Sequence, residues 1–200
     1  MEQVRAFVAI ELPDKLKLEL ARLQATLKQP NQKWVKWVDP SGIHLTLKFL
    51  GNIGVDKISS ITAAMKVAVQ GIPPFRLEVS RLGAFPDLRQ VQVVWVGIGG
   101  EIDRLRQLQQ RVESQLVPLG FIAEKRAFTA HLTVARLRNQ APSDERQRLG
   151  QLIAATGFES THIVEVEAVN LMRSQLTREG AIYSKIAAVG LNKPLPNGTA

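Results

Sequence analysis

Apolar positions along the chain follow two alternating periods, one typical of helices and one typical of strands. Leucines at 16, 20, 23 and 27 fall on one helical face, and the alternation over 43–50 predicts a strand that ends at Gly51. The same patterns predict helices over 14–29, 58–70, 101–116 and 144–155, and strands over 4–11, 43–50, 75–82, 91–97, 128–137, 163–172 and 181–189. The last residues, 191–200, contain two prolines and a glycine and are expected to form a loose tail.

The order helix, strand, helix, strand, strand occurs twice along the chain. An offset of 87 residues carries the first helix start, Asp14, onto the third, Glu101, and carries Phe75 onto His162. The two halves share little sequence, so the repeat is one of architecture. It predicts one α+β domain over 1–190 with a bilobal, duplicated fold. Each lobe should hold an antiparallel or mixed sheet with outer helices, and a central cleft should lie between the lobes.

Composition narrows the classes of function. Apolar residues make up 45% of the chain and charged residues 22%, as in soluble globular proteins. The absence of cysteine excludes disulfides, thiol catalysis and cysteine-ligated metals. A net charge of +8 favours nucleic acid or a phosphorylated small molecule, although a basic surface without a partner explains it equally well. No apolar run could span a membrane, and the patch over 6–10 is too short for a signal peptide, so a cytoplasmic location is expected.

Two of the three histidines begin the same short motif, His-Leu-Thr followed by an apolar residue. The motifs are His44 to Leu47 and His131 to Val134, and the histidines are 87 residues apart, which is the offset of the repeat. With only nine threonines in the chain, the chance of finding Thr two residues after two of three histidines is roughly one in a hundred. The matched position within the repeat makes coincidence less plausible still.

Strand geometry gives this motif a chemical meaning. Residues i and i+2 of a strand share a face, so His44 and Thr46 should point together, as should His131 and Thr133. Leu45, Leu47 and Phe49 are expected on the opposite, core face of the first strand, with Leu132 and Val134 in the same position on the second.

Two imidazoles that face each other suit displacement at phosphorus. One histidine can take a proton from the attacking oxygen while the other protonates the leaving oxygen, because the imidazole pKa lies near neutrality. The threonine hydroxyls can donate hydrogen bonds to the phosphate oxygens. No metal or cofactor is expected, because acidic residues beside the motifs are sparse.

The alternative interpretation is that both histidines are structural and bond a backbone carbonyl within their own lobe. A single His-x-Thr would favour that interpretation, but two motifs at matched positions in a basic chain favour catalysis. His162 has no matching partner and is expected to be a surface residue rather than a third catalyst.

The residues around both motifs resemble the 2H phosphoesterases, and most closely their branch of RNA 2′,3′-cyclic phosphodiesterases, also called 2′-5′ RNA ligases. The similarity extends over about residues 4 to 189. The segments that carry it are Arg5 to Pro13, Trp37-Val38, His44 to Gly51, Gly83 to Pro86, Phe128 to Arg136, Leu171 to Ser174 and Gly180 to Tyr183.

This resemblance implies hydrolysis of a terminal 2′,3′-cyclic phosphate to a 2′-phosphomonoester. It implies that His44 donates a proton to the leaving O3′ and that His131 accepts the proton of water. Thr46 and Thr133 would bind the phosphate. Family members also join or split 2′-5′ linkages in tRNA halves, which is the same chemistry with an RNA hydroxyl in place of water.

The resemblance also implies that Phe7 and Arg136 contact the nucleotide, by stacking or by a cation–π interaction. Phe7 could equally be a core residue. By strict alternation Arg136 faces away from His131, so it must reach the site from a strand end or a bulge, or remain a surface residue. One departure is Ala130, where the family usually has proline before the second histidine, which is expected to loosen the placement of His131.

Two other functions stay open from the sequence. One is a non-catalytic module that binds RNA ends, and the other is a 2H enzyme acting on another cyclic or 2′-5′-linked nucleotide. The expected partner is RNA with a 2′,3′-cyclic phosphate terminus, with tRNA halves among the candidates. A monomer is expected, since the two lobes together supply both motifs.

Overall fold

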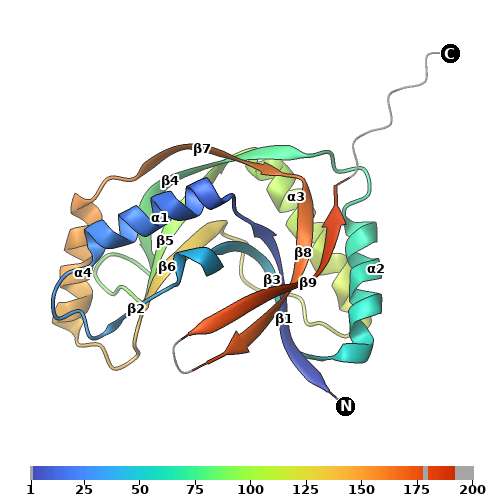
Figure 1. Ribbon diagram of the computed structural model, residues 1–200, viewed down its shortest axis with the longest axis horizontal. Coiled ribbons are helices and arrows are strands. Elements are labelled where there is room, and N and C mark those ends of the chain that lie inside the picture. Colours follow the sequence, from blue (N-terminus) through green and yellow to red (C-terminus); the bar gives the residue numbers. More distant parts are fainter. Residues whose placement is uncertain (1, 178–179, 192–200) are drawn as a thin grey trace.

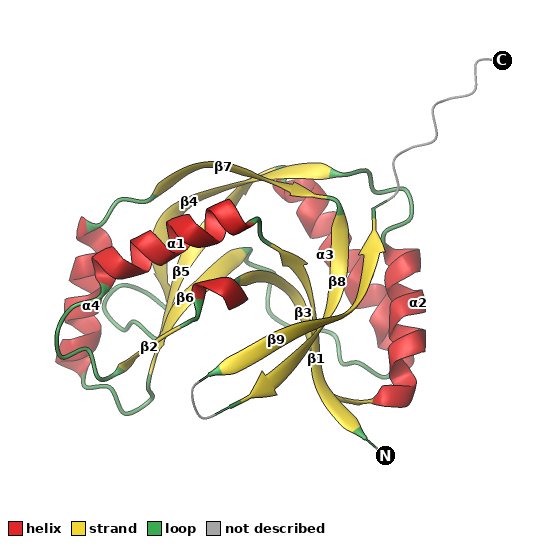
Figure 2. Ribbon diagram, viewed as in Figure 1, coloured by secondary structure: helices red, strands yellow, loops and turns green. Residues whose placement is uncertain are grey.

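The computed structural model describes residues 2–177 and 180–191, so the predicted tail lies outside the described residues except for Leu191. The α-helices are α1 (Asp14–Leu27), α2 (Ile58–Ala68), α3 (Ile102–Leu116) and α4 (Ser143–Ala155) (Figures 1 and 2). The strands are β1 (Gln3–Glu11), β2 (Val35–Trp37), β3 (His44–Gly54), β4 (Phe75–Phe85), β5 (Val93–Gly100), β6 (His131–Leu137), β7 (Glu159–Val166), β8 (Ala168–Leu176) and β9 (Ala181–Gly190). None of the described helices is both long and apolar enough to cross a membrane.

The strands form two antiparallel sheets, which confirms the predicted α+β class and its antiparallel sheets. One sheet has the order β3-β1-β8-β9 and the other the order β2-β6-β5-β4-β7. Spatial order differs from chain order, because β2 and β4 lie in the sheet of β6, whereas β8 and β9 complete the sheet of β1 and β3. Each sheet is therefore built from segments that lie far apart in the sequence.

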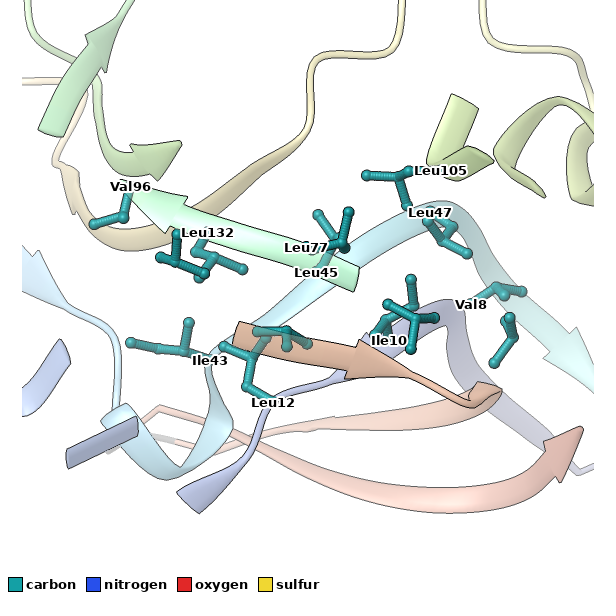
Figure 3. Packing of buried hydrophobic residues seen from close by; sticks show 14 of the residues in the cluster. Val8, Ile10, Leu12, Ile43, Leu45, Leu47, Leu77, Val96, Leu105 and Leu132 are labelled. Carbon is teal, nitrogen blue, oxygen red and sulfur yellow. The ribbon is translucent and has the colours of Figure 1, made fainter. Parts of the chain in front are cut away.

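One continuous apolar core lies between the sheets and the helices. The predicted face of α1 supplies the buried residues Leu16, Leu20, Leu23 and Leu27, and even-numbered residues of β1 point into the same core. Figure 3 shows Leu45 of β3 packed in one layer with Leu77 of β4, and Leu132 of β6 in the same cluster. The core sides of the two motif-bearing strands thus meet in a single packed interior.

Each pair of helices covers one sheet. Helix α1 contacts β7 and α4 contacts β4, so both lie with the five-stranded sheet. Helix α3 contacts β3, while α2 contacts β9 and α3, so these two lie with the four-stranded sheet (Figure 1). Helices α1 and α3 therefore follow a strand of one sheet and pack against the other sheet, which interlocks the two lobes.

Two predicted segments differ from the structure in their division or length, and one short strand was not predicted. The single strand expected over 163–172 is two strands, β7 and β8, which separate at Glu167 and belong to different sheets. The strand expected to end at Gly51 continues to Gly54, because Gly51 adopts a φ of 73° beside a register shift and lets pairing with β1 resume. The short edge strand β2 was not predicted, since three residues are too few to show alternation.

Candidate active site

The two His-x-Thr motifs begin the strands β3 and β6, one in each sheet. These strands approach each other within 8 Å, measured between Cα atoms. In both strands the leucine of the motif is buried, while the histidine and the threonine are only half-buried. We call the side of each strand that carries the histidine and threonine its motif face.

A β-bulge interrupts both motif strands at the same point. In β3, Lys48 and Thr46 pair with consecutive residues of β1, which leaves Leu47 as the extra residue. In β6, Ala135 and Thr133 pair with consecutive residues of β5, which leaves Val134 as the extra residue. Leu47 and Val134 are 87 positions apart, so the repeat extends to this irregularity of the backbone.

Because a bulge adds one residue, side chains beyond it change face. Phe49 is 66% exposed and lies on the motif face, so the prediction that it fills the core was wrong. Arg136 holds the matching position in β6, where it is exposed between buried Ala135 and Leu137. The bulge brings Arg136 to the same face as His131. A bulge is one of the ways in which, from the sequence, Arg136 could reach the site.

Each motif histidine is held by the same hydrogen bond. His44 Nδ1 lies 2.7 Å from the carbonyl oxygen of Gly42, and His131 Nδ1 lies 2.7 Å from that of Thr129. Since a carbonyl only accepts, Nδ1 carries the proton and donates it in both cases. A structural histidine would make the same bond, but neither Nε2 atom has a hydrogen-bond partner among the described residues. Both rings are fixed in one tautomer, with Nε2 left to exchange a proton.

An aromatic cage surrounds the His44 ring. Phe7 stacks on it with ring centroids 4.5 Å apart, and Tyr183 meets it edge-on at 4.9 Å. Phe7 is only 2% exposed, so its ring supports His44, and its contact with a nucleotide stays a prediction. Burial lowers the pKa of His44 below the ordinary 6.5 more strongly than the Gly42 carbonyl raises it, and Lys17 lowers it further. Gly42 belongs to this cage, because a Cβ there would lie 2.9 Å from the Tyr183 ring.

His131 has more open surroundings. Its only aromatic neighbour among the described residues is Phe85 at the end of β4, with centroids 5.0 Å apart and rings nearly perpendicular. Phe85 in turn contacts Trp95 of β5 at 5.2 Å. Ala130 is partly buried and packs against the core, in the place where the family usually has proline. The two histidines therefore make the same kind of hydrogen bond and have the same tautomer, but His44 has two aromatic neighbours and His131 has one among the described residues.

Tyr183 of β9 lies near enough to Arg136 and Arg5 for their charges to affect the pKa of its phenol. Burial raises the pKa of its phenol, while the positive charges of Arg136 and Arg5 lower it. Arg136 comes from β6, whereas Tyr183 comes from β9 and touches His44. The charge of Arg136, beside the second motif, therefore affects the pKa of a residue that encloses the first histidine.

The threonines complete each motif face. Thr46 and Thr133 are half-buried, and neither hydroxyl is hydrogen-bonded to a residue in the part of the chain that the structure describes. Both hydroxyls are therefore available to donate hydrogen bonds to a ligand.

Polar groups from the helices support both bulges from behind. Buried Lys48 forms an ion pair with Glu113 of α3 and also donates to the carbonyl of Ile122 at 2.9 Å. Glu113 accepts a further bond from the backbone of Glu124, in the loop that leads to His131. Behind the second bulge, Gln24 of α1 donates to the carbonyls of Val134 and Val38 at 2.9 and 2.7 Å.

His162 lies away from both motifs, as expected from its lack of a partner. It is on β7, the edge strand of the five-stranded sheet, where its Nδ1 is 2.7 Å from Glu19 Oε1. Ser160 donates to the other oxygen of the same carboxylate. These bonds attach β7 to α1, so the third histidine joins two elements of the fold.

Sequence reasoning assigned no role to Tyr183 or Phe85 and misplaced Phe49. Tyr183 and Phe85 do lie in segments that resemble the 2H phosphoesterases, Gly180 to Tyr183 and Gly83 to Pro86, and that resemblance was the available signal. Their contacts with His44 and His131 depend on pairing between distant strands, which no local pattern indicates.

Comparison with known proteins agrees with this geometry. The family described as LigT like Phosphoesterase matches the chain in two consecutive stretches, residues 10–95 and 96–183. The RNA 2′,3′-cyclic phosphodiesterase of Methanothermobacter thermautotrophicus is 34% identical over 182 residues, covering 91% of this chain and 96% of that protein. The protein of the same name from Aeropyrum pernix is 34% identical over 170 residues, covering 85% and 93%.

Solved structures with a similar fold include two bacterial proteins. E. coli LigT complexed with 3′-AMP has a TM-score of 0.76 at 24% identity, covering 96% of this chain and all of that chain. The protein TT0787 of Thermus thermophilus has a TM-score of 0.75 at 24% identity, covering 94% and 97%. At this level of identity the likeness establishes the fold.

Proposed function

Because the chain belongs to the LigT-like phosphoesterase family, we propose that it hydrolyses terminal 2′,3′-cyclic phosphates of RNA to 2′-phosphomonoesters. The observation that carries this proposal is the matched pair of histidines, each with Nδ1 bonded to a carbonyl and Nε2 free. Relatives named RNA 2′,3′-cyclic phosphodiesterase, at 34% identity over most of the chain, support the choice of substrate.

In the proposed reaction the two motif faces line one cleft and act on opposite sides of the phosphorus. His131 Nε2 takes a proton from water as the water oxygen bonds to phosphorus. The bond between phosphorus and O3′ breaks, and His44 Nε2 gives its proton to O3′. The product carries a 2′-phosphate and a free 3′-hydroxyl, and each proton transfer contributes roughly 10²–10⁴ in rate.

The environment of His44 supports its role as the donor. A lowered pKa makes the protonated ring a stronger acid, which suits transfer of a proton to an alkoxide leaving group. The negative charge of a bound phosphate would stabilise the protonated form and offset part of the effect of burial. His131, in its more open surroundings, remains for the step that requires access to water.

The remaining site residues have roles that follow from their positions. Thr46 and Thr133 would donate to the non-bridging oxygens, where negative charge builds up in the transition state. Phe49 and Arg136, exposed at matched bulge positions, would hold the terminal base between a ring and a guanidinium. Phe7 supports this subsite from below, since it contacts both His44 and Phe49.

The test is turnover of a nucleoside 2′,3′-cyclic phosphate and of an RNA that ends in one. We expect His44→Ala and His131→Ala each to reduce kcat by about 10²–10⁴, because each removes one proton transfer. His162→Ala is the matched control and should retain full activity, since that histidine bonds Glu19 far from both motifs. Chemical analysis of the product should show a 2′-phosphate, and EDTA should leave the rate unchanged.

Each alternative gives a different result in the same assay. A binding module would hold RNA ends with salt-dependent affinity but turn nothing over. A 2H enzyme for another nucleotide would cleave a 2′-5′-linked or differently cyclised substrate faster than the RNA terminus. Full activity in either motif variant, or loss of activity in EDTA, would contradict the proposed mechanism.

A further inference from the structure

Four basic side chains gather where β2 pairs with the far end of β6. Lys36 is the register partner of Arg136, Arg138 donates its backbone N–H to Trp34, and Lys33 lies over the Trp34 ring at 5.3 Å. All four cations are exposed. We call Lys33, Lys36, Arg136 and Arg138 the basic strip.

The strip continues the motif face of β6. Val35 and Trp37 pack against the core, so Lys36 between them points to the opposite side. The same holds for Arg136 between the buried Ala135 and Leu137, and cross-strand partners share a face. Lys36 and Arg136 therefore continue the motif face away from His131, and Lys33 and Arg138 lie beside them at the same end of the sheet.

The charge of the strip is not neutralised by the protein within the described residues. None of the ion pairs among the described residues includes Lys33, Lys36, Arg136 or Arg138. The carboxylate of Glu145 on α4, which lines one pocket with Trp34 and Val35, is paired with Arg148 at 3.3 Å. The strip is thus a local excess of positive charge, in a protein whose net charge is +8.

Protection of the sheet edge explains only part of this arrangement. Short edge strands commonly carry a lysine that discourages pairing with another chain, and β2 is a three-residue edge strand. One lysine on β2 would serve that purpose, whereas two of the four cations lie on or directly after β6, inside the sheet. An anionic occupant accounts for the whole set.

We propose that Lys33, Lys36 and Arg138, the members of the basic strip beyond the base subsite at Arg136, bind the sugar-phosphate backbone of the RNA on the 5′ side of the cyclic phosphate. This inference rests on the proposed function, which places the terminal nucleotide at the motif faces. The path along the chain from His131 to Arg138 is about 23 Å long, and slightly shorter because of the bulge. This path is longer than a single nucleotide. The terminal nucleotide occupies the beginning of that path, and the preceding phosphates follow the strip.

The strip predicts a measurable length preference. For single-stranded nucleic acid, each phosphate contact makes the slope of log affinity against log salt concentration steeper by about 0.7. At about 0.15 M salt, one such contact raises the affinity roughly fourfold. A nucleoside cyclic phosphate has no preceding phosphate and should gain nothing from Lys33, Lys36 or Arg138.

The experiment compares kcat/KM for two substrates, a nucleoside 2′,3′-cyclic phosphate and an oligoribonucleotide of about ten residues with the same terminus. Lys33→Ala, Lys36→Ala and Arg138→Ala should each lower kcat/KM for the oligonucleotide about fourfold, and the triple variant about fiftyfold. All of them should leave turnover of the nucleoside substrate unchanged. Lys66→Ala on α2 is the matched control, because it removes one exposed positive charge away from the strip.

Binding of a fluorescent oligoribonucleotide that ends in a 2′-phosphate provides a measurement without turnover. Its salt slope should become shallower by about 0.7 for each strip residue removed and should not change for Lys66→Ala. Equal losses on both substrates, or no loss on either, would overturn the proposal. If wild-type protein does not turn over the nucleoside substrate, the proposed function fails, while the binding slopes still decide whether the strip contacts RNA.

Discussion

The strands β3 and β6 have the same local structure but different surroundings. Both begin with His-x-Thr, both have a bulge after the same apolar residue, and both histidines donate Nδ1–H to the carbonyl two residues earlier. Yet His44 is enclosed by Phe7 and Tyr183, whereas His131 meets only the edge of Phe85 among the described rings. The repeat has thus kept the geometry that orients the imidazole and has let its aromatic surroundings vary, as separate acid and base roles would require.

The support behind the two bulges differs in the same way. Lys48 and Glu113 place an ion pair behind the first bulge, while Gln24 places a neutral amide behind the second. The equivalent of Lys48 in β6 is Ala135, which has no charge to pair. Both bulges are therefore anchored by a polar group, which is charged in β3 and a neutral amide in β6.

The threonines provide the sharpest test of equivalence between the halves. Thr46→Val and Thr133→Val should each lower kcat by about 10², because each removes one hydrogen-bond donor to the charged oxygens of the transition state. Serine at either position should restore most of the activity, since it returns the hydroxyl. A loss confined to one threonine in steady-state kinetics would show that only one half holds the phosphate.

The ion pair behind the first bulge should matter more to stability than the glutamine behind the second. Lys48→Met leaves the half-buried Glu113 without its cation and should lower the free energy of unfolding by about 3 kcal/mol in urea denaturation. The double variant Lys48→Met/Glu113→Leu should recover much of that loss. Gln24→Leu removes hydrogen bonds between neutral groups and should cost about 1 kcal/mol.

An exposed ion pair on α4 serves as the control for these stability measurements. Arg148→Met breaks contacts with Asp144 and Glu145 at the surface and should change the free energy of unfolding by less than about 1 kcal/mol. If Lys48→Met cost no more than Arg148→Met, the buried pair would not anchor the bulge.

The pH profile offers the finest distinction between the two histidines. If His44 is the proton donor, activity is present below its pKa and is lost as pH rises through it, so kcat/KM should begin to fall below the ordinary 6.5. Phe7→Ala exposes the ring, raises the pKa of His44, and should move this alkaline limb to higher pH. If His44 is instead the acceptor, the same variant should move the acid limb upward and narrow the profile.

Nuclear magnetic resonance titration of the His44 ring can confirm the direction of the shift independently of catalysis. Phe85→Ala, which alters the surroundings of His131, should leave the His44 titration unchanged. A change in the His44 titration in that variant would mean that the two sites are coupled through the core.

The sequence predicted the parts of this site that depend only on neighbouring residues and on the repeat. Alternation placed His44 and Thr46 on one face, and the 87-residue offset matched them to His131 and Thr133. It failed at Phe49, because alternation assumes a regular strand and the bulge at Leu47 depends on pairing with β1. It also treated 163–172 as one strand, since a change of sheet at Glu167 leaves no mark on the apolar pattern. Tyr183 could be placed beside His44 only by the pairing of β8 with β1.

The position of β9 in the chain has a consequence for biosynthesis. The strand that brings Tyr183 to His44 is the last one described, and it pairs only with β8, which in turn pairs with β1 from the beginning of the chain. During translation, which proceeds from the N-terminus, the four-stranded sheet therefore cannot be completed until β9 has left the ribosome. Until then the ring of His44 lacks its contact with Tyr183, so a nascent chain surrounded by ribosomal and transfer RNA does not yet carry the complete aromatic cage.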